Sequence, residues 1–319
     1  MSFILQAEHL KKYFKTPKGI LHAVDDISFS MKKGKTLGVV GESGCGKSTL
    51  GRTVLRLIDP TDGAIIFNGE NITNIQGKEL KHLRSQMQMI FQDPFSSLDP
   101  RKTVSEIIEE PLWVFGRLSR TERKEKVRHL MDVVGLAERL ADSYPHELDG
   151  GRRQRIGIAR AIALDPSLIV CDEPVSALDV SIQAQILNLM QDLQKEKQLT
   201  YMFITHDMSV VRHMSDDILV MYLGQAVEEC PSEMIFENQL HPYTQALLSA
   251  VPVPSPDHQR KRILLRGEVS SPIDPPDGCR FAARCIYSDE LCHKENPALR
   301  ELLPQHFVAC HKAERFLKD

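Results

Sequence analysis

The chain has 319 residues, which suggests about two domains, and its 40 basic and 43 acidic residues leave a formal net charge of −3. This near-balance gives no bulk attraction to nucleic acid or to an anionic membrane, and a hydrophobic share of 42% is ordinary for a globular protein. No run of about 18 apolar residues occurs and the first residues lack the pattern of a secretory signal, so a cytoplasmic location is expected.

Short apolar runs predict an α/β fold for residues 1–250. The runs are rich in β-branched residues and several are bounded by turn-formers, which is typical of strands buried on both faces of a parallel sheet. Helical spacing lies between them, and from about residue 84 to 164 the pattern is mainly helical, which predicts a helical subdomain. The four runs are Thr36–Val40, Leu168–Cys171, Tyr201–Ile204 and Ile218–Met221.

A phosphate-binding motif, G-x-x-x-x-G-K-[ST], follows the first of these runs and precedes an apolar helix. Glycines let the backbone wrap around phosphate oxygens, and the loop amides at a helix N-terminus supply hydrogen-bond donors. Lys47 is expected to reach the β- and γ-phosphates, and Ser48 to bind Mg²⁺. A chance glycine-rich turn would lack the flanking strand and helix. The residues expected to bind nucleotide here are Gly41, Glu42, Ser43, Gly44, Cys45, Gly46, Lys47, Ser48 and Thr49.

Two acids end the second apolar run. Acidic side chains at the end of a buried strand are costly unless they have a function. Asp172 is expected to hold the Mg²⁺ shell and Glu173 to polarise the attacking water, although a plain strand-to-turn transition before Pro174 is the alternative. Together with the phosphate loop, the pair predicts a nucleoside triphosphatase.

Further motifs occur in a fixed order along the chain. They are Phe91-Gln92-Asp93-Pro94, Leu148-Asp149-Gly150-Gly151-Arg152, Ser176-Ala177-Leu178-Asp179 and Thr205-His206-Asp207. In this order the set resembles the ATP-binding subunits of ABC transporters, over the whole of residues 1–250. The resemblance implies a P-loop ATPase core with a helical subdomain, and ATP and Mg²⁺ as ligands.

The resemblance also implies a role for each motif. Gln92 is the glutamine that contacts Mg²⁺ and reports to the membrane subunits, and His206 contacts the γ-phosphate. An aromatic side chain ahead of the phosphate loop stacks on adenine; the family spacing favours Phe14, with Tyr13 as the alternative. The signature comprises Leu148, Asp149, Gly150, Gly151 and Arg152, and the D-loop comprises Ser176, Ala177, Leu178 and Asp179.

The implied mechanism is a sandwich dimer, in which each ATP lies between the phosphate loop of one chain and the signature of the other. ATP closes this interface, hydrolysis opens it, and membrane helices respond to the change. The partner chain is a second, homologous ATPase or another copy of this chain. Two permease subunits and, indirectly, an external solute-binding protein complete the expected assembly at the cytoplasmic face of the membrane, with no nucleic-acid partner.

The signature departs from the family pattern Leu-Ser-Gly-Gly-Gln, since Asp149 replaces Ser and Arg152 replaces Gln. A carboxylate about 5 Å from a γ-phosphate costs roughly 3 kcal/mol at an effective dielectric of 20, which would weaken the ATP site that this signature completes. Two simpler interpretations compete and are favoured. Asp is a good helix N-cap, and the charge of Arg152 or Arg153 can offset it.

Three stretches resemble one branch of the family, the dipeptide and oligopeptide importer ATPases of the F-subunit kind. They are Tyr144–Leu148, Glu173–Ser181 and His241–Thr244, and the resemblance continues at Gly278–Phe281. Nickel importers share the pattern, so import of nickel or another small solute is the alternative. A non-transport ABC ATPase is a second alternative, disfavoured by the single ATPase unit and the near-neutral charge.

Residues 251–319 are expected to form a small cysteine-rich domain, separated by the proline-rich linker Val251–Pro256. A core of 69 residues usually needs a staple, and four of the seven cysteines fall there, with the spacing C-x5-C-x6-C-x17-C. A [4Fe–4S] cluster is preferred for this wide spacing, with Zn²⁺ or no metal as alternatives, and a disulfide framework is disfavoured. The expected ligands are Cys279, Cys285, Cys292 and Cys310.

Two cysteines lie elsewhere in motifs. Cys45 occupies a helix N-terminus in the phosphate loop, a position that can lower a thiol pKa and make it oxidation-sensitive, although the simpler interpretation is a variable position of the motif. Cys171 is expected to be a buried strand residue.

Overall fold

The computed structural model describes residues 2–116, 118–251, 263–265, 267 and 271–317. These residues divide into two compact units. The middle unit comprises residues 32–35 and 74–202, and the split unit comprises residues 3–31, 36–73 and 203 onward. Apart from Val251, the predicted linker Val251–Pro256 lies outside the described residues.

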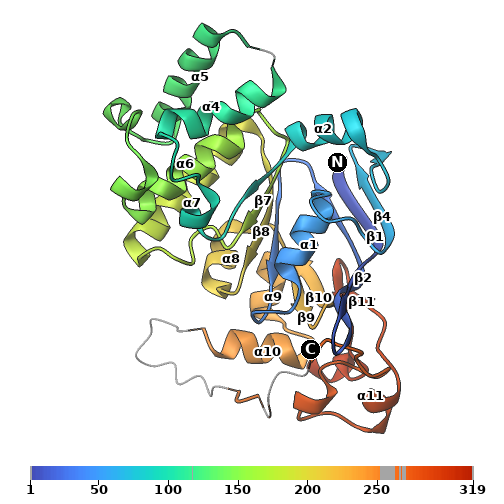
Figure 1. Ribbon diagram of the computed structural model, residues 1–319. Coiled ribbons are helices and arrows are strands. Elements are labelled where there is room, and N and C mark those ends of the chain that lie inside the picture. Colours follow the sequence, from blue (N-terminus) through green and yellow to red (C-terminus); the bar gives the residue numbers. More distant parts are fainter. Residues whose placement is uncertain (1, 117, 252–262, 266, 268–270, 318–319) are drawn as a thin grey trace. The chain divides into compact units, whose positions relative to one another are not determined.

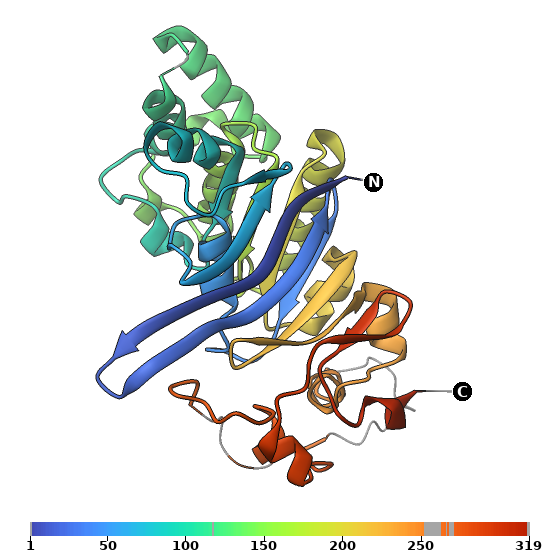
Figure 2. The same cartoon turned by 90° about the vertical axis from the view of Figure 1, so that its right-hand side faces the viewer.

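An antiparallel sheet forms the N-terminal part of the split unit, with the order β2-β1-β4-β5. Figure 2 shows β1 and β2 side by side as two long blue strands. β1 pairs with β4 from Leu5 opposite Phe67 to Lys11 opposite Asp62, with an irregularity after Glu8. The apolar runs did not predict this sheet. Its strands are β1 (Phe3–Thr16), β2 (Gly19–Lys32), β4 (Asp62–Phe67) and β5 (Glu70–Asn71).

A second set of strands in the split unit has the order β11-β12-β10-β9-β3. β3 runs parallel to β9, with Val40 opposite Val220, and the other pairs are antiparallel. All five residues of β3 are buried, as expected for a strand covered on both faces. The strands are β3 (Thr36–Val40), β9 (Asp217–Tyr222), β10 (Gln225–Pro231), β11 (Arg300–Leu303) and β12 (His306–Val308).

The helices of the split unit are short, and one core joins several of them to the strands. Val220 and Tyr222 of β9 pack with Tyr243 and with Phe281, which is 2% exposed. This core therefore includes residues from the cysteine-rich part of the chain. The helices are α1 (Lys47–Val54), α8 (Met208–Met214), α9 (Ser232–Glu237), α10 (Pro242–Ser249) and α11 (Glu290–Lys294), with 3₁₀ turns at Ala282–Arg284 and Ala313–Phe316.

The middle unit contains the predicted helical region, drawn in green in Figure 1. Its strands β6 (Met87–Ile90) and β7 (Leu168–Asp172) are parallel, with Ile90 opposite Cys171. The third predicted run, Tyr201–Ile204, lies in β8 (Thr200–Thr205), along which the chain passes into the split unit. The helices are α2 (Gly77–Gln86), α3 (Pro94–Ser97), α4 (Val104–Phe115), α5 (Arg120–Val133), α6 (Gly150–Ile162) and α7 (Val180–Lys197), with 3₁₀ turns at Glu138–Leu140 and Pro145–Glu147.

The four predicted strands are confirmed. The signature segment opens α6, which begins at Gly150. Asp149 caps the helix there. Within the described residues, no helix is both long and apolar enough to cross a membrane.

Candidate functional site

The phosphate loop connects β3 to α1, and its shape requires glycine. Gly46 caps α1 with a φ of 104°, and a Cβ there would lie 1.9 Å from the carbonyl oxygen of Ala23 in β2. Gly41 has a φ of 155°, and a Cβ would lie 2.2 Å from the Met221 carbonyl. Since no larger residue fits these two positions, the backbone of β2 and β9 holds the loop closely.

Lys47 is the first residue of α1 and is only 5% exposed. Its ammonium group donates hydrogen bonds to the carbonyl oxygens of Gly41 (2.8 Å) and Glu42 (2.9 Å). Both acceptors belong to the loop that Lys47 is expected to share with phosphate. The ammonium group of Lys47 is therefore held within the loop by two of the loop's own carbonyl oxygens.

Of the two interpretations of Cys45, the structure contradicts the lowered thiol pKa, which the sequence had not favoured. The side chain is 3% exposed, and burial raises its pKa despite the opposing charge of Lys47. The position of Cys45 next to a helix start does not overcome the loss of solvent around the thiolate. Cys171 is buried in β7 as expected, and all seven cysteines are free thiols.

Glu42, in the phosphate loop, is held by residues far along the chain. Its carboxylate accepts two hydrogen bonds from the guanidinium of Arg284, at 2.7 and 3.1 Å. Its backbone N–H donates to the hydroxyl of Tyr243 at 2.8 Å. The side chain of Arg284 is 9% exposed and that of Glu42 is 26% exposed, so this bidentate ion pair is largely shielded from water.

Tyr13 and Phe14, the candidate adenine-stacking residues, lie in β1 and point to opposite faces of the strand. The Tyr13 ring stacks on His22 with centroids 4.1 Å apart, and its hydroxyl bonds to Asp25. Burial and the contact with Asp25 raise the Tyr13 pKa. The Phe14 ring instead lies under the ammonium of Lys12, 4.9 Å from its centroid.

Gln92 and Glu173 lie together in the middle unit. Each follows one of the paired parallel strands β6 and β7, whose carboxyl ends meet at the same edge. The Gln92 amide donates to the Glu173 carboxylate at 3.0 Å. Asp172, the last residue of β7, is buried, whereas Glu173 is half-buried. Glu173 has a φ of 45°, a strained conformation for a residue with a side chain, and such strain is common at functional sites.

The signature begins α6. The Asp149 carboxylate accepts a hydrogen bond from the Arg152 backbone N–H at 2.8 Å, which confirms the N-cap interpretation. The Arg152 side chain lies 3.4 Å from the same carboxylate, so it also offsets part of the charge. A Cβ on Gly150 would lie 3.1 Å from Leu178, which places the signature beside the D-loop. Of the remaining D-loop residues, Ser176, Ala177 and Asp179 are exposed.

His206 follows β8 and is exposed, and Asp207 caps the next helix, α8. The phosphate loop and His206 belong to the split unit, whereas Gln92, Asp172, Glu173 and the signature belong to the middle unit.

The four C-terminal cysteines line one cavity of about 10 Å³, together with residues that include His241, Phe281 and Lys312. Burial raises the thiol pKa of Cys279 and of Cys310 to about 11. The Lys312 backbone N–H donates to the Cys310 sulfur at 3.3 Å. Backbone hydrogen bonds from Phe281 to the Cys279 sulfur and from Tyr287 to the Cys285 sulfur oppose this rise but do not outweigh burial.

The structure does not support the predicted [4Fe–4S] or Zn²⁺ site as a preformed ligand set. Among the described residues, no three His, Cys, Asp or Glu side chains are arranged to hold a metal ion. The cavity is about the size of one water molecule, so a cluster of iron and sulfur atoms requires the four cysteines to move apart.

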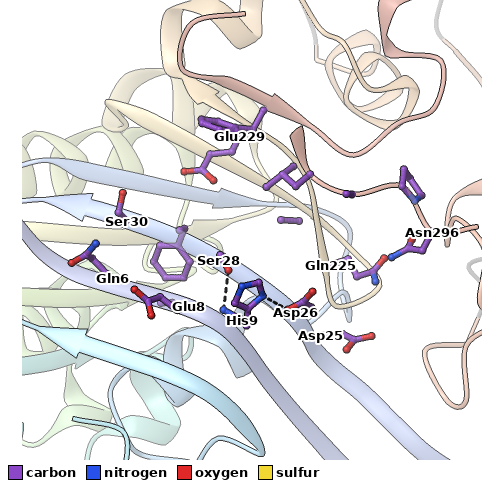
Figure 3. A pocket seen from close by; sticks show the side chains of 17 residues that line it. Gln6, Glu8, His9, Asp25, Asp26, Ser28, Ser30, Gln225, Glu229 and Asn296 are labelled. Carbon is purple, nitrogen blue, oxygen red and sulfur yellow. Dashed lines mark hydrogen bonds and ion pairs between the residues drawn. The ribbon is translucent and has the colours of Figure 1, made fainter. Parts of the chain in front are cut away.

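A larger cavity of about 740 Å³ also lies in the split unit, between β1, β2, β10 and the segment Asn296–Leu299. Figure 3 shows its acidic lining, where His9 and Asp26 face each other with Nδ1 and Oδ1 2.8 Å apart. Burial raises the pKa of Glu229, on the opposite wall, to about 7. None of the residues predicted to bind nucleotide lines this cavity.

Comparisons with known proteins match two parts of the chain to families. Residues 24–176 match the ABC transporter family, and residues 227–292 match the oligopeptide/dipeptide transporter C-terminal region. The chain is 54% identical over 318 residues to the oligopeptide transport ATP-binding protein AppF of Bacillus subtilis, with 97% of each chain covered. It is 49% identical to the dipeptide transport ATP-binding protein DppF of Haemophilus influenzae, with 96% of each chain covered.

Solved structures show the same core fold. The dimeric, ADP- and phosphate-bound ATP-binding cassette MJ0796 superposes with a TM-score of 0.66 at 29% identity, covering 72% of this chain and 98% of that one. CbiO1 from Clostridium perfringens, part of the ABC transporter complex cbiONQ, gives a TM-score of 0.66 at 28% identity, covering 74% of this chain and 92% of that one.

Proposed function

The chain belongs to the ATP-binding proteins of oligopeptide and dipeptide ABC transporters, and on that premise we propose that it hydrolyses ATP to drive import of di- and oligopeptides. The observation that carries this proposal is the similarity of nearly the whole chain to peptide-transport ATP-binding proteins, such as AppF at 54% identity, combined with an intact phosphate loop. The similarity includes the C-terminal region typical of this branch.

We propose the following division of labour among the polar residues. Lys47 and the loop amides bind the β- and γ-phosphates, and Ser48 with Asp172 binds Mg²⁺. Glu173 polarises the attacking water, Gln92 contacts Mg²⁺, and His206 contacts the γ-phosphate. Support comes from the storage of Lys47 on loop carbonyls and from the contact between Gln92 and Glu173.

For the adenine base, the surroundings favour Tyr13 over Phe14. Tyr13 stacks on His22, whose neighbour Ala23 packs against Gly46 of the phosphate loop. The Asp25 backbone N–H also bonds to Gly224, and the Gly224 N–H in turn bonds to the Cys45 carbonyl. These contacts place Tyr13 near the loop that binds the phosphates.

The working assembly contains two ATPase chains and two permease subunits, at the cytoplasmic face of the membrane. The exposed residues of the signature and the D-loop supply a surface for the second ATPase, and the similar cassette MJ0796 is a dimer with ADP and phosphate. The permease contact lies on the region around α3 and α4, whose apolar side chains Phe95 and Trp113 are 58% and 66% exposed.

We also propose that the four C-terminal cysteines hold a metal group, a [4Fe–4S] cluster or Zn²⁺. Four thiols around one cavity, with backbone N–H groups directed at sulfur, have the donor chemistry for either group. Bound there, the group would cross-link the turn before Cys285 to α11 and to the end of β12. Iron and zinc analysis of protein purified without oxygen tests this proposal; protein lacking both metals contradicts it.

Glu173→Gln tests the ATPase mechanism. The amide cannot polarise water as the carboxylate does but has the same size, so we expect ATP binding to persist while hydrolysis falls by about 10²–10³-fold. The chain should then accumulate as an ATP-bound dimer, measured by size-exclusion chromatography with light scattering. Hydrolysis at the parent rate would contradict the role assigned to Glu173.

The transported solute is tested with the complete transporter in proteoliposomes. We expect the external binding protein loaded with a peptide to stimulate ATP hydrolysis and peptide uptake. Stimulation by nickel alone, without a response to any di- or oligopeptide, would reject peptide import in favour of the nickel alternative.

A further inference from the structure

Two arginines of the C-terminal region reach the nucleotide side of the split unit. Arg280 directly follows Cys279, and Arg284 directly precedes Cys285. The turn between them is closed by hydrogen bonds from the Ala282 N–H to the Cys279 carbonyl and from the Arg284 N–H to the Phe281 carbonyl. The two side chains are thus carried by one short, ordered segment.

This segment is fixed in the core. Phe281 packs against Tyr222 and Tyr243, with ring centroids 5.2 and 5.5 Å away. The Cys279 N–H bonds to the Cys292 carbonyl at 2.8 Å, and a Cβ on Gly278 would lie 2.6 Å from His293. Because this segment is tightly packed, its position fixes the positions of the two arginines that it carries.

Arg284 acts on the phosphate end of the site. Its two hydrogen bonds to the Glu42 carboxylate hold Glu42, the second residue of the phosphate loop, in position. The carbonyl of Glu42 is one of the two acceptors for the Lys47 ammonium. The chain of contacts therefore runs from Arg284 through Glu42 to Lys47.

Arg280 acts on the base end. Its guanidinium forms a buried ion pair with Asp25 and also bonds to the Leu223 carbonyl. Asp25 receives the hydroxyl of Tyr13 and lies 3.2 Å from His22, on which Tyr13 stacks. Burial raises the Asp25 pKa, but the bonds from Tyr13 and His22 and the charge of Arg280 outweigh it and lower the pKa overall.

We propose that Arg280 and Arg284 are positioning residues for the nucleotide, one for the adenine side through Asp25 and Tyr13, the other for the phosphates through Glu42. The C-terminal region thereby sets nucleotide affinity from within the same chain. This inference rests on the proposed assignment of the phosphate loop and Tyr13.

The test is calorimetric titration of the full-length chain with MgADP and with magnesium pyrophosphate, neither of which the chain hydrolyses as an ATPase. Arg284→Met should weaken both ligands by about tenfold, because it releases the phosphate loop. Arg280→Met should weaken MgADP by about tenfold and leave pyrophosphate unchanged, because it releases only the base side. General loosening of the fold would weaken both ligands in both variants, so that outcome overturns the proposal.

Matched variants keep the test decisive. Arg300→Met removes a half-exposed ion pair with Glu314 in the same region, and should bind both ligands like the parent. Arg284→Lys and Arg280→Lys retain the charge but lose the fork of donors, so intermediate affinities are expected even if a Met variant does not fold. In a double-mutant cycle, Glu42→Gln should remove most of the additional effect of Arg284→Met.

Lys47→Ala distinguishes a failure of the phosphate-loop assignment from a failure of the role proposed for the two arginines. If it keeps the parent affinity for pyrophosphate, the assignment of the phosphate loop fails. If it loses that affinity while both arginine variants bind like the parent, only the role of the arginines is rejected.

Discussion

The phosphate loop and the pair Gln92–Glu173 belong to different compact units and are held in opposite ways. The loop is gripped by its own chain: glycines fit against the backbone of β2 and β9, and Glu42 is paired with Arg284. Gln92 is exposed, and so are Asp149 and Arg152 of the signature and three of the four D-loop residues. The comparison shows that side chains and backbone of the same chain hold the region assigned to phosphate binding, whereas several polar groups of the other region face solvent.

The prediction with the largest expected effect concerns the phosphate loop. Lys47→Ala removes the stored cation and the anchor of two loop carbonyls, so ATP hydrolysis by the assembled transporter should fall by about 10²–10³-fold. Phosphate release measures the effect. Lys294→Ala, which breaks only a surface pair with Glu290, serves as the control and should keep the parent rate.

The second prediction concerns the pH dependence of the stability of α10, the helix whose Tyr243 accepts a hydrogen bond from the Glu42 N–H of the phosphate loop. His241 caps α10 by accepting the Tyr243 N–H at Nδ1, and burial lowers its pKa to about 4 despite the charge of Glu228. The neutral form is favoured in the folded state, so its contribution is complete above about pH 6.5 and is lost as pH falls toward 4. The loss amounts to about 3 kcal/mol.

Denaturant unfolding at several pH values measures this effect. His241→Asn keeps a capping side chain without a titratable group, so its stability should fall less than that of the parent between pH 6.5 and 4. Burial raises the Glu229 pKa to about 7, which changes stability in the opposite direction, so the comparison between parent and variant is the informative quantity. Parallel pH curves for the two chains would refute the role of His241.

The smallest effect tests the exposed region. Asp149→Ala removes the cap of α6 and should lower the free energy of unfolding by about 1 kcal/mol, whereas Asp149→Ser retains a cap and should lower it by only a few tenths. Chemical denaturation measures both. If the carboxylate also repels a γ-phosphate, Asp149→Ser should raise ATP hydrolysis by the assembled heterodimer; an unchanged rate removes that hypothesis.

The sequence predicted the parts of the fold that depend on local pattern. Buried strands such as β3 and β7 are continuous apolar runs, and the phosphate loop is a fixed spacing of Gly, Lys and Ser. The sheet of β1, β2 and β4 was not predicted, because β1 mixes buried and exposed residues without clean alternation and is interrupted after Glu8.

The sequence predicted which residues would form the candidate site, but it did not predict the distant side chains that hold them in position. Nothing local in the sequence connects Glu42 to Arg284 or Asp25 to Arg280, since each pair is separated by more than 240 residues. The direction of the Cys45 pKa was left open by the sequence for a similar reason. Position at a helix start is visible in the sequence, but the burial of the Cys45 thiol depends on the tertiary fold.

The separation of Glu42 and Arg284 also has a consequence for protein synthesis. The partner of Glu42 is made 242 residues after it, which at about 5–20 residues per second is a delay of roughly 12–48 s on the ribosome. On the proposed role of Arg284, the growing chain carries a complete phosphate motif that still binds nucleotide weakly. Full affinity then arises only after the segment from Cys279 to Cys285 has been made and has folded, so nucleotide binding would report that this segment is in place.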